Sequence, residues 1–86
     1  MLKTGMKAFI ETTTKYWTGE VEDFDFDYIV LKKAAWIPDT GRLSDCFTTG
    51  ECAEVEPYPD NVMVRVKIDQ IVNVTDWPFP LPRTRK

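Results

Sequence analysis

Aromatic, hydroxyl and arginine side chains that can hold a small anionic ligand gather around the turns of this chain. Tyr16 and Trp17 open one β-forming stretch, Trp36 closes another, and Thr40 and Arg42 follow shortly after it. Aromatic faces stack on nucleobases, arginine forks grip phosphates at two points, and backbone amides at a helix start favour an anion. Trp36, Thr40 and Arg42 therefore predict a nucleotide-recognition cluster, with Tyr16 or Trp17 as a further stacking surface.

Each of these residues also has a purely structural interpretation. An aromatic side chain more often packs in a core or at an interface than on a ligand, and Arg42 can simply bridge to a nearby acid. Arg65 and Lys67 share the strand face opposite a row of valines. That face is either solvated or, in an oligomer, part of a shared pocket, and on the second interpretation Arg65 joins the candidate ligand-binding residues.

The sequence gives little support for a catalytic site or a metal site. The chain contains no histidine, which excludes Ser-His and Cys-His dyads and most zinc sites. Its four glycines are dispersed, so no phosphate-binding loop is present. Cys46 and Cys52 have no third cysteine with which to complete a zinc site. We expect no enzyme and no cofactor, and two small, semi-buried, reduced cysteines.

The charge balance narrows the class of partner. The net charge is −3, from 14 acids and 11 bases. Three of the bases lie in the last four residues, and five of the acids lie within residues 20–27. The rest of the chain is therefore more acidic than the net charge of the whole chain indicates. An acidic body disfavours broad binding of nucleic acid, which needs many Lys and Arg contacts to phosphates. With no secretory signal and no apolar run long enough for a membrane helix, we expect a cytoplasmic protein.

The elements that would position these residues are short strands. β-formers and alternation predict strands at residues 8–13, 16–21, 28–37, 62–67 and 71–75, and a short helix over 42–47. The expected helix cap is Asp39 or Thr40, and Gly50 is the expected stop. Residues 20–27 are expected to form a solvated turn, and residues 57–59 an extended loop. The predicted fold is mainly β, a strongly bent antiparallel barrel of SH3-like or Sm-like type with about five strands and one short helix.

The chain ends in a proline-rich segment. We predict one domain over residues 1–76 and an extended tail over residues 77–86. Trp77, Phe79 and Leu81 are large apolar side chains on this tail, and such a segment docks either across its own domain or onto a second copy. This composition favours a homo-oligomer with these three residues at the interface.

The order of segments over residues 8–76 resembles small uncharacterised phage-encoded β-barrel proteins. The resemblance is carried by Phe9-Ile10-Glu11-Thr12, Tyr16-Trp17-Thr18-Gly19-Glu20-Val21 and Ile29-Val30-Leu31-Lys32-Lys33-Ala34-Ala35-Trp36-Ile37. A short helix at residues 43–47 and a last strand at residues 71–74 follow. This chain departs from those proteins at Ala34–Ala35, where they carry an arginine pair, and in its end from Trp77.

Phage proteins of this size and type resemble counter-defence factors of the anti-CBASS or anti-Thoeris kind. The resemblance implies a nucleotide sponge: a homo-oligomer that sequesters a cyclic nucleotide immune signal in the host cytoplasm without cleaving it. The alternative is a protein-interaction module that inhibits a host protein through its acidic face or its proline-rich tail.

Overall fold

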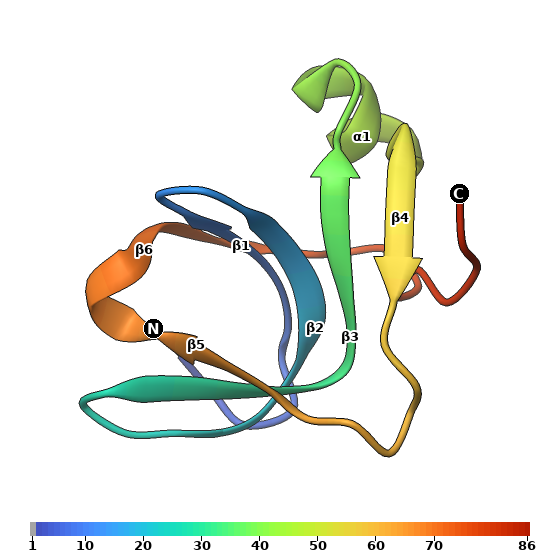
Figure 1. Cartoon of the computed structure of the whole chain (residues 1–86). Coiled ribbons are helices and arrows are strands. Elements are labelled where there is room, and N and C mark those ends of the chain that lie inside the picture. The colour runs from blue at the N-terminus through green and yellow to red at the C-terminus, as the bar shows by residue number, and fades with distance from the viewer. Residues whose placement is uncertain (1) are drawn as a thin grey trace.

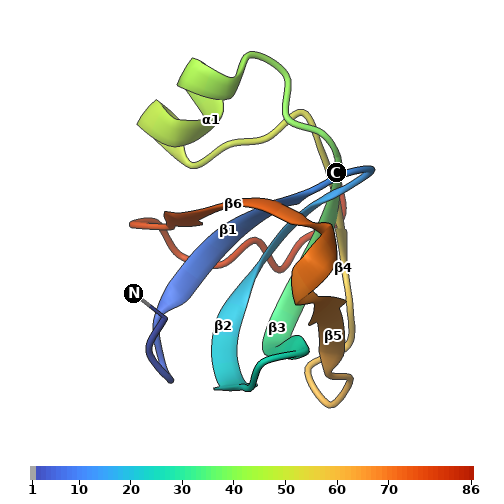
Figure 2. The same ribbon diagram turned by 90° about the vertical axis from the view of Figure 1, so that its left-hand side faces the viewer.

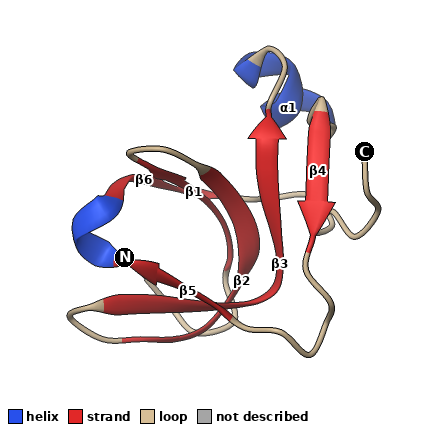
Figure 3. Ribbon diagram, viewed as in Figure 1, coloured by secondary structure: helices blue, strands red, loops and turns tan. Residues whose placement is uncertain are grey.

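Alternating β-branched and aromatic residues produce six strands, all of them paired antiparallel, and a single short helix in the computed structural model, which describes residues 2–86 (Figures 1 and 3). The mainly β prediction with one short helix is confirmed. The elements are β1 (Lys7–Thr12), β2 (Tyr16–Phe24), β3 (Tyr28–Asp39), α1 (Leu43–Thr49), β4 (Glu54–Pro57), β5 (Val64–Lys67), the 3-10 turn η1 (Ile68–Gln70) and β6 (Ile71–Asp76).

Strand β3 organises the sheet because two strands share one of its edges. The strand order is β4-β3-β2-β1-β6, and β5 also pairs with β3. Residues 28–31 of β3 pair with β5 and residues 35–39 with β4. Between them Lys33 has φ 49, a left-handed conformation that is rare for a residue with a side chain. Figure 1 shows β3 turning sharply between its two partners.

The strongly bent sheet does not close within residues 2–86. Strands β5 and β6 are connected by η1, and no ladder joins them in this part of the chain. The antiparallel, bent character of the sheet is as predicted, whereas closure into a barrel is not confirmed.

Gly19 lies where two strands approach each other closely. A Cβ atom built on Gly19 would lie 3.0 Å from the Cβ of Leu31 on β3, and the pairing of β2 with β3 shifts register between Thr18 and Glu20. A glycine inside a strand is typical of such a close backbone approach.

The acidic run is mostly strand, and the prediction of a solvated turn over residues 20–27 is wrong for residues 20–24. Val21 is buried, while Glu20 and Glu22 point outward and form ion pairs with Lys32 of β3, at 3.4 and 3.5 Å. Burial of the valine and neutralisation of its neighbours keep this segment in the sheet. The turn itself occupies only residues 25–27.

Helix α1 begins later than predicted. Its cap residue is Arg42, which makes no side-chain capping bond. The predicted cap at Asp39 or Thr40 is wrong, because the Asp39 carboxylate accepts the N–H of Gly41 at 2.8 Å and so stabilises the preceding turn. The stop at Gly50 is confirmed, with φ 77.

Two other stretches differ from expectation. Strand β4 was not predicted, and the loop expected over residues 57–59 overlaps it only at Pro57; pairing with β3 makes residues 54–57 a strand. Strand β5 begins at Val64 rather than residue 62, and of its predicted apolar face only Val66 is buried. On α1, Leu43 is 51% exposed, whereas Cys46 is buried.

The buried side chains form two hydrophobic clusters. The strand cluster lies within the bent sheet and consists of strand residues alone: Ala8, Ile10, Val21, Ile29, Leu31, Ala34 and Val66. The tail cluster combines strand residues with side chains of α1, of the loop after it and of the C-terminal tail: Phe9, Ala35, Ile37, Cys46, Cys52, Val55 and Trp77.

The proline-rich tail packs against its own chain. Trp77 is 1% exposed, and its ring contacts the rings of Phe9, Phe47 and Phe79 at centroid distances of 5.9, 5.4 and 5.2 Å. The backbone N–H of Trp77 donates to the carbonyl of Lys7 at 3.0 Å. Trp77 is therefore part of the core of its own chain and is not a free surface for a second copy.

The rest of the tail continues along the sheet. Phe79 and Leu81 are partly buried against the tail cluster. Further on, Lys86 and Val55 exchange two backbone hydrogen bonds of 2.9 Å, which covers the outer edge of β4. Figures 1 and 2 show the tail crossing the sheet to reach this edge, with α1 set at one end of the molecule. Of the two docking modes predicted for the tail, the structure has the one across its own domain.

Candidate functional site

One cleft is lined by aromatic rings, prolines and carboxylates, and we call it the acidic cleft. It has a volume of about 410 Å³, within the range of about 300–1,000 Å³ typical of ligand pockets. Its lining comprises Trp36, Pro38, Glu54, Glu56, Pro57, Tyr58 and Pro59.

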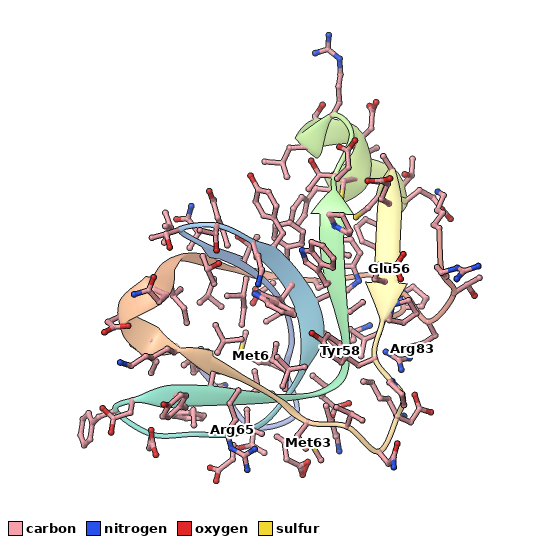
Figure 4. The ribbon with its side chains drawn as sticks, viewed as in Figure 1. Met6, Glu56, Tyr58, Met63, Arg65 and Arg83 are labelled. Atoms are coloured by element: carbon pink, nitrogen blue, oxygen red, sulfur yellow. The ribbon has the colours of Figure 1, made fainter. Side chains whose placement is uncertain are left out.

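Strand alternation places the two glutamates in this cleft. On β4, Val55 is buried in the tail cluster, so its neighbours Glu54 and Glu56 face outward. Glu56 is the register partner of Trp36 on β3, which puts a carboxylate beside an indole ring that is 38% exposed. Figure 4 shows Glu56 on β4 and Tyr58 just beyond the end of that strand.

A second, smaller cleft of about 170 Å³ has the opposite character, and we call it the basic cleft. No carboxylate lines it. Its lining consists of Thr12, Thr13, Thr14, Lys15, Trp17, Arg65, Val66, Lys67 and Gln70.

The β1–β2 turn forms one wall of the basic cleft and is held firmly. The N–H of Lys15 donates to the hydroxyl oxygen of Thr12 at 2.9 Å, and the N–H of Thr13 donates to the carbonyl of Gln70 at 3.0 Å. The Lys15 ammonium lies 5.9 Å from the centroid of the Trp17 ring, a cation–π distance. The turn, η1 and Trp17 thus form a fixed frame that carries positive charge.

The basic residues of β5 also face acids. Lys67 forms an ion pair with Asp69 at 3.6 Å. Arg65 lines a further hollow that contains Asp23, Asp25 and Tyr28, and Figure 4 shows its side chain directed away from the concave side of the sheet. Lys15 is therefore the cation most closely associated with the Trp17 ring.

The two clefts are neighbours. Trp17 lines the basic cleft, Tyr58 lines the acidic one, and their ring centroids are 6.0 Å apart. Both rings also pack against the strand cluster. One region of the surface thus carries aromatic rings with positive charge on one side and negative charge on the other.

The predicted ligand-binding residues do not form a single site. Trp17 and Arg65 meet in the basic cleft, whereas Trp36 lies in the acidic cleft. Tyr16 packs against Phe9, with ring centroids 5.4 Å apart, on the side of the tail cluster.

Thr40 and Arg42 lie in the connection between β3 and α1 and line neither cleft. The Thr40 hydroxyl donates to the carbonyl of Gly41 at 2.8 Å, and Arg42 is exposed. The predicted grouping of Trp36 with these two residues is therefore not formed within one cleft.

Four charged residues of the clefts were not among the predicted ligand-binding residues: Lys15, Lys67, Glu54 and Glu56. Of these, only Lys67 was named from the sequence, on the strand face that it shares with Arg65. Lys15 had a usable signal, since it directly precedes Tyr16 and Trp17 in a predicted turn. The two glutamates flank a valine, a strand-like alternation that the nearby prolines obscured.

Cys46 and Cys52 are both buried, more deeply than the semi-buried positions expected, and their thiols are free. Burial raises the pKa of each thiol, that of Cys52 to about 12, so both stay protonated at neutral pH. Among residues 2–86 no three His, Cys, Asp or Glu side chains come together as a metal site. In the same range no helix has the length and apolar character needed to span a membrane.

Compared with protein-family models, curated proteins and solved structures, the chain gives no match.

Proposed function

We propose that this protein is a phage-type counter-defence protein that binds a cyclic nucleotide immune signal and sequesters it without cleavage. The observation that carries the proposal is the basic cleft, in which Lys15 lies beside a tryptophan ring and threonine hydroxyls, with Arg65 and Lys67 in the same lining and no carboxylate. An aromatic face and a cation at its edge suit a base and its phosphate. The proposal places this binding in the host cytoplasm.

The size of the basic cleft favours binding between copies of the chain. About 170 Å³ is below the usual range of ligand pockets, so a cyclic dinucleotide would fill it only in part. A second copy across the cleft would enclose the ligand and add a second set of cations. The homo-oligomer and an SH3-like or Sm-like closure of the sheet belong to the same proposal.

Native mass spectrometry of the purified protein with cyclic di- and trinucleotides and cyclic ADP-ribose isomers tests the proposal. We expect an oligomer that retains intact ligand and releases it unchanged on denaturation. Lys15→Glu should weaken binding at least about tenfold, because it places a negative charge beside the Trp17 ring. Lys3→Glu makes the same charge change at an exposed site outside the cleft and should bind as the wild type does.

Arg42→Ala locates the site. If it removes binding while Lys15→Glu does not, the ligand lies at the β3–α1 connection and not in the basic cleft. A wild-type protein that retains none of these nucleotides contradicts the sponge.

The second candidate is inhibition of a host protein through the acidic hairpin between β2 and β3, and its turn carries the supporting observation. Phe26 is 99% exposed between Asp25 and Asp27. The Asp25 carboxylate accepts the N–H groups of Asp27 and Tyr28 at 2.7 and 2.9 Å, which fixes the turn. Phe26→Ser should abolish capture of a host protein in a pull-down and leave nucleotide binding unchanged. Unchanged capture by this variant would reject the hairpin as the contact.

A further inference from the structure

The acidic cleft has negative charge with no partner among residues 2–86. Among residues 2–86, the side chains of Glu54 and Glu56 form no ion pair and no hydrogen bond. No lysine or arginine lines the cleft. Two carboxylates beside an aromatic wall attract a cation and repel a phosphate, so this cleft has a different ligand class from the basic one.

The aromatic side chains favour a cation with an apolar body. Trp36 and Tyr58 present rings to the cleft, and the faces of such rings attract guanidinium and ammonium groups. Pro38, Pro57 and Pro59 complete an apolar wall. An arginine or lysine side chain matches this surface, with its stem along rings and prolines and its head at the carboxylates.

The cleft is preformed. Strand β4 is paired with β3 on one edge and with Lys86 on the other. Beyond it, the N–H of Tyr58 donates to the carbonyl of Ala34 at 2.9 Å. The guanidinium of Arg83 donates to the carbonyl of Tyr58 and to the carboxylate of Asp60. Figure 4 labels Arg83 and Tyr58 near the end of β4. Prolines with fixed φ lie on both sides of Tyr58, so little conformational freedom is lost when a ligand binds.

We propose that the acidic cleft binds an extended basic segment of a partner protein, with one arginine or lysine side chain between Trp36 and the carboxylates of Glu54 and Glu56. Extended, proline-compatible segments dock in grooves lined by aromatic and proline side chains, and the carboxylates select a basic one. No residue of the chain's own basic tail lines the cleft: the Arg83 guanidinium donates to Asp60, and the Lys86 ammonium donates to Glu51. This inference is independent of the nucleotide proposal, because it concerns the other cleft.

The test is isothermal titration calorimetry with a blocked peptide in which arginines alternate with prolines. The matched probe carries citrulline, which has the same shape and no charge, in place of each arginine. We expect measurable binding of the arginine peptide, weaker in high salt, and at least about tenfold weaker binding of the citrulline peptide. The Glu54→Gln/Glu56→Gln variant and Trp36→Ala should each weaken the arginine peptide about tenfold. The double variant Glu22→Gln/Asp27→Asn removes the same charge outside the cleft and should bind as the wild type does.

Several results would overturn the proposal. These are equal affinity for the two peptides, wild-type affinity in both cleft variants, or no heat with the arginine peptide at low salt. Blocked arginine alone binding as tightly as the peptide would also overturn it, because the occupant would then be a small cation. Thermal melting of each variant shows that the fold is kept, as expected for exposed side chains. Lys15→Glu should leave peptide binding intact, which separates this result from the nucleotide proposal.

Discussion

The strand cluster and the tail cluster differ in which parts of the chain build them. The strand cluster uses residues of β1, β2, β3 and β5, and the two rings that connect the clefts, Trp17 and Tyr58, pack against it. The tail cluster needs α1, the loop after it and Trp77 to cover strand residues. The two clusters therefore have different roles. The strand cluster supports the two rings that connect the clefts, whereas the tail cluster holds the end of the chain and, through Val55, strand β4 with its two glutamates.

The largest expected effect comes from removing the side chain that closes the tail cluster. Trp77→Ala should lower the free energy of unfolding by about 3–5 kcal/mol, because it leaves a large cavity among Phe9, Phe47 and Phe79. Urea denaturation followed by circular dichroism measures this change. Trp36→Ala, at an exposed position outside both clusters, is the control and should cost less than about 1 kcal/mol. A similar loss of unfolding free energy in both variants would contradict the role of Trp77 in the tail cluster.

The end of α1 gives the next effect. Gly50 has φ 77, and a Cβ there would lie 2.7 Å from the Cγ of Phe79. Gly50→Ala should therefore cost about 2–3 kcal/mol, from backbone strain plus displacement of the Phe79 ring. Gly5 has φ 92 with nothing within 4 Å of its Cβ position, so Gly5→Ala should show the backbone part alone, about 1 kcal/mol. If urea denaturation shows the same loss of unfolding free energy for Gly50→Ala and Gly5→Ala, the contact between the tail and Gly50 contributes nothing to stability.

Thr18 offers a way to strengthen the tail cluster. It is fully buried opposite Phe9 and Ala35, and its hydroxyl has no hydrogen-bond partner in the described part of the chain, residues 2–86. Thr18→Val keeps the shape and removes the unpaired hydroxyl, which should raise the free energy of unfolding by about 1 kcal/mol. Thr18→Ser keeps the hydroxyl, loses a methyl group and should be destabilising. A loss of stability in the valine variant would show that the hydroxyl is satisfied in solution.

The smallest effect concerns the acidic hairpin, outside both clusters. Hydrogen bonds from the N–H groups of Tyr28 and Asp27 hold the pKa of Asp25 below its ordinary value of 3.8. Because the folded-state pKa is lowered, the carboxylate stabilises the fold above that value, and the contribution is lost as the pH falls through the folded-state pKa. Thermal melting should show a small acid-dependent loss that Asp25→Ala removes. An identical pH profile in this variant would contradict the role of Asp25.

The sequence predicted five of the six strands because their signals are local. Alternation and β-branching locate β1, β2, β3, β5 and β6 to within a few residues. Strand β4 depends on pairing with β3 and Lys86, which lie 15 or more positions away in sequence. Its own short alternation is obscured by the nearby prolines, so the local sequence does not predict this pairing. The end of β2 is similar, since its glutamates are kept in the sheet by Lys32 of the next strand.

The candidate site was harder to predict than the fold. The types of residue were useful, because Trp17, Trp36 and Arg65 all line clefts. Their grouping was not predictable, because Trp17 and Trp36 are register partners whose surroundings differ. Trp17 adjoins the β1–β2 turn with Lys15, whereas Trp36 adjoins the glutamates of β4. Which charges meet an aromatic ring is decided by the sheet order, and that is a property of the whole chain.

The pairing of β1 with β6 has a consequence for folding kinetics. Ala8 is the partner of Asp76, and the carbonyl of Lys7 accepts the N–H of Trp77, so segments almost 70 residues apart must meet before one edge of β1 is paired. The β2–β3 hairpin closes over a short turn and can form early. The contact order of the whole sheet is nevertheless high, which places folding in the range of about milliseconds to seconds. During synthesis, β1 stays open on that edge until residues 71–77 have been made, and only then can Trp77 complete the tail cluster.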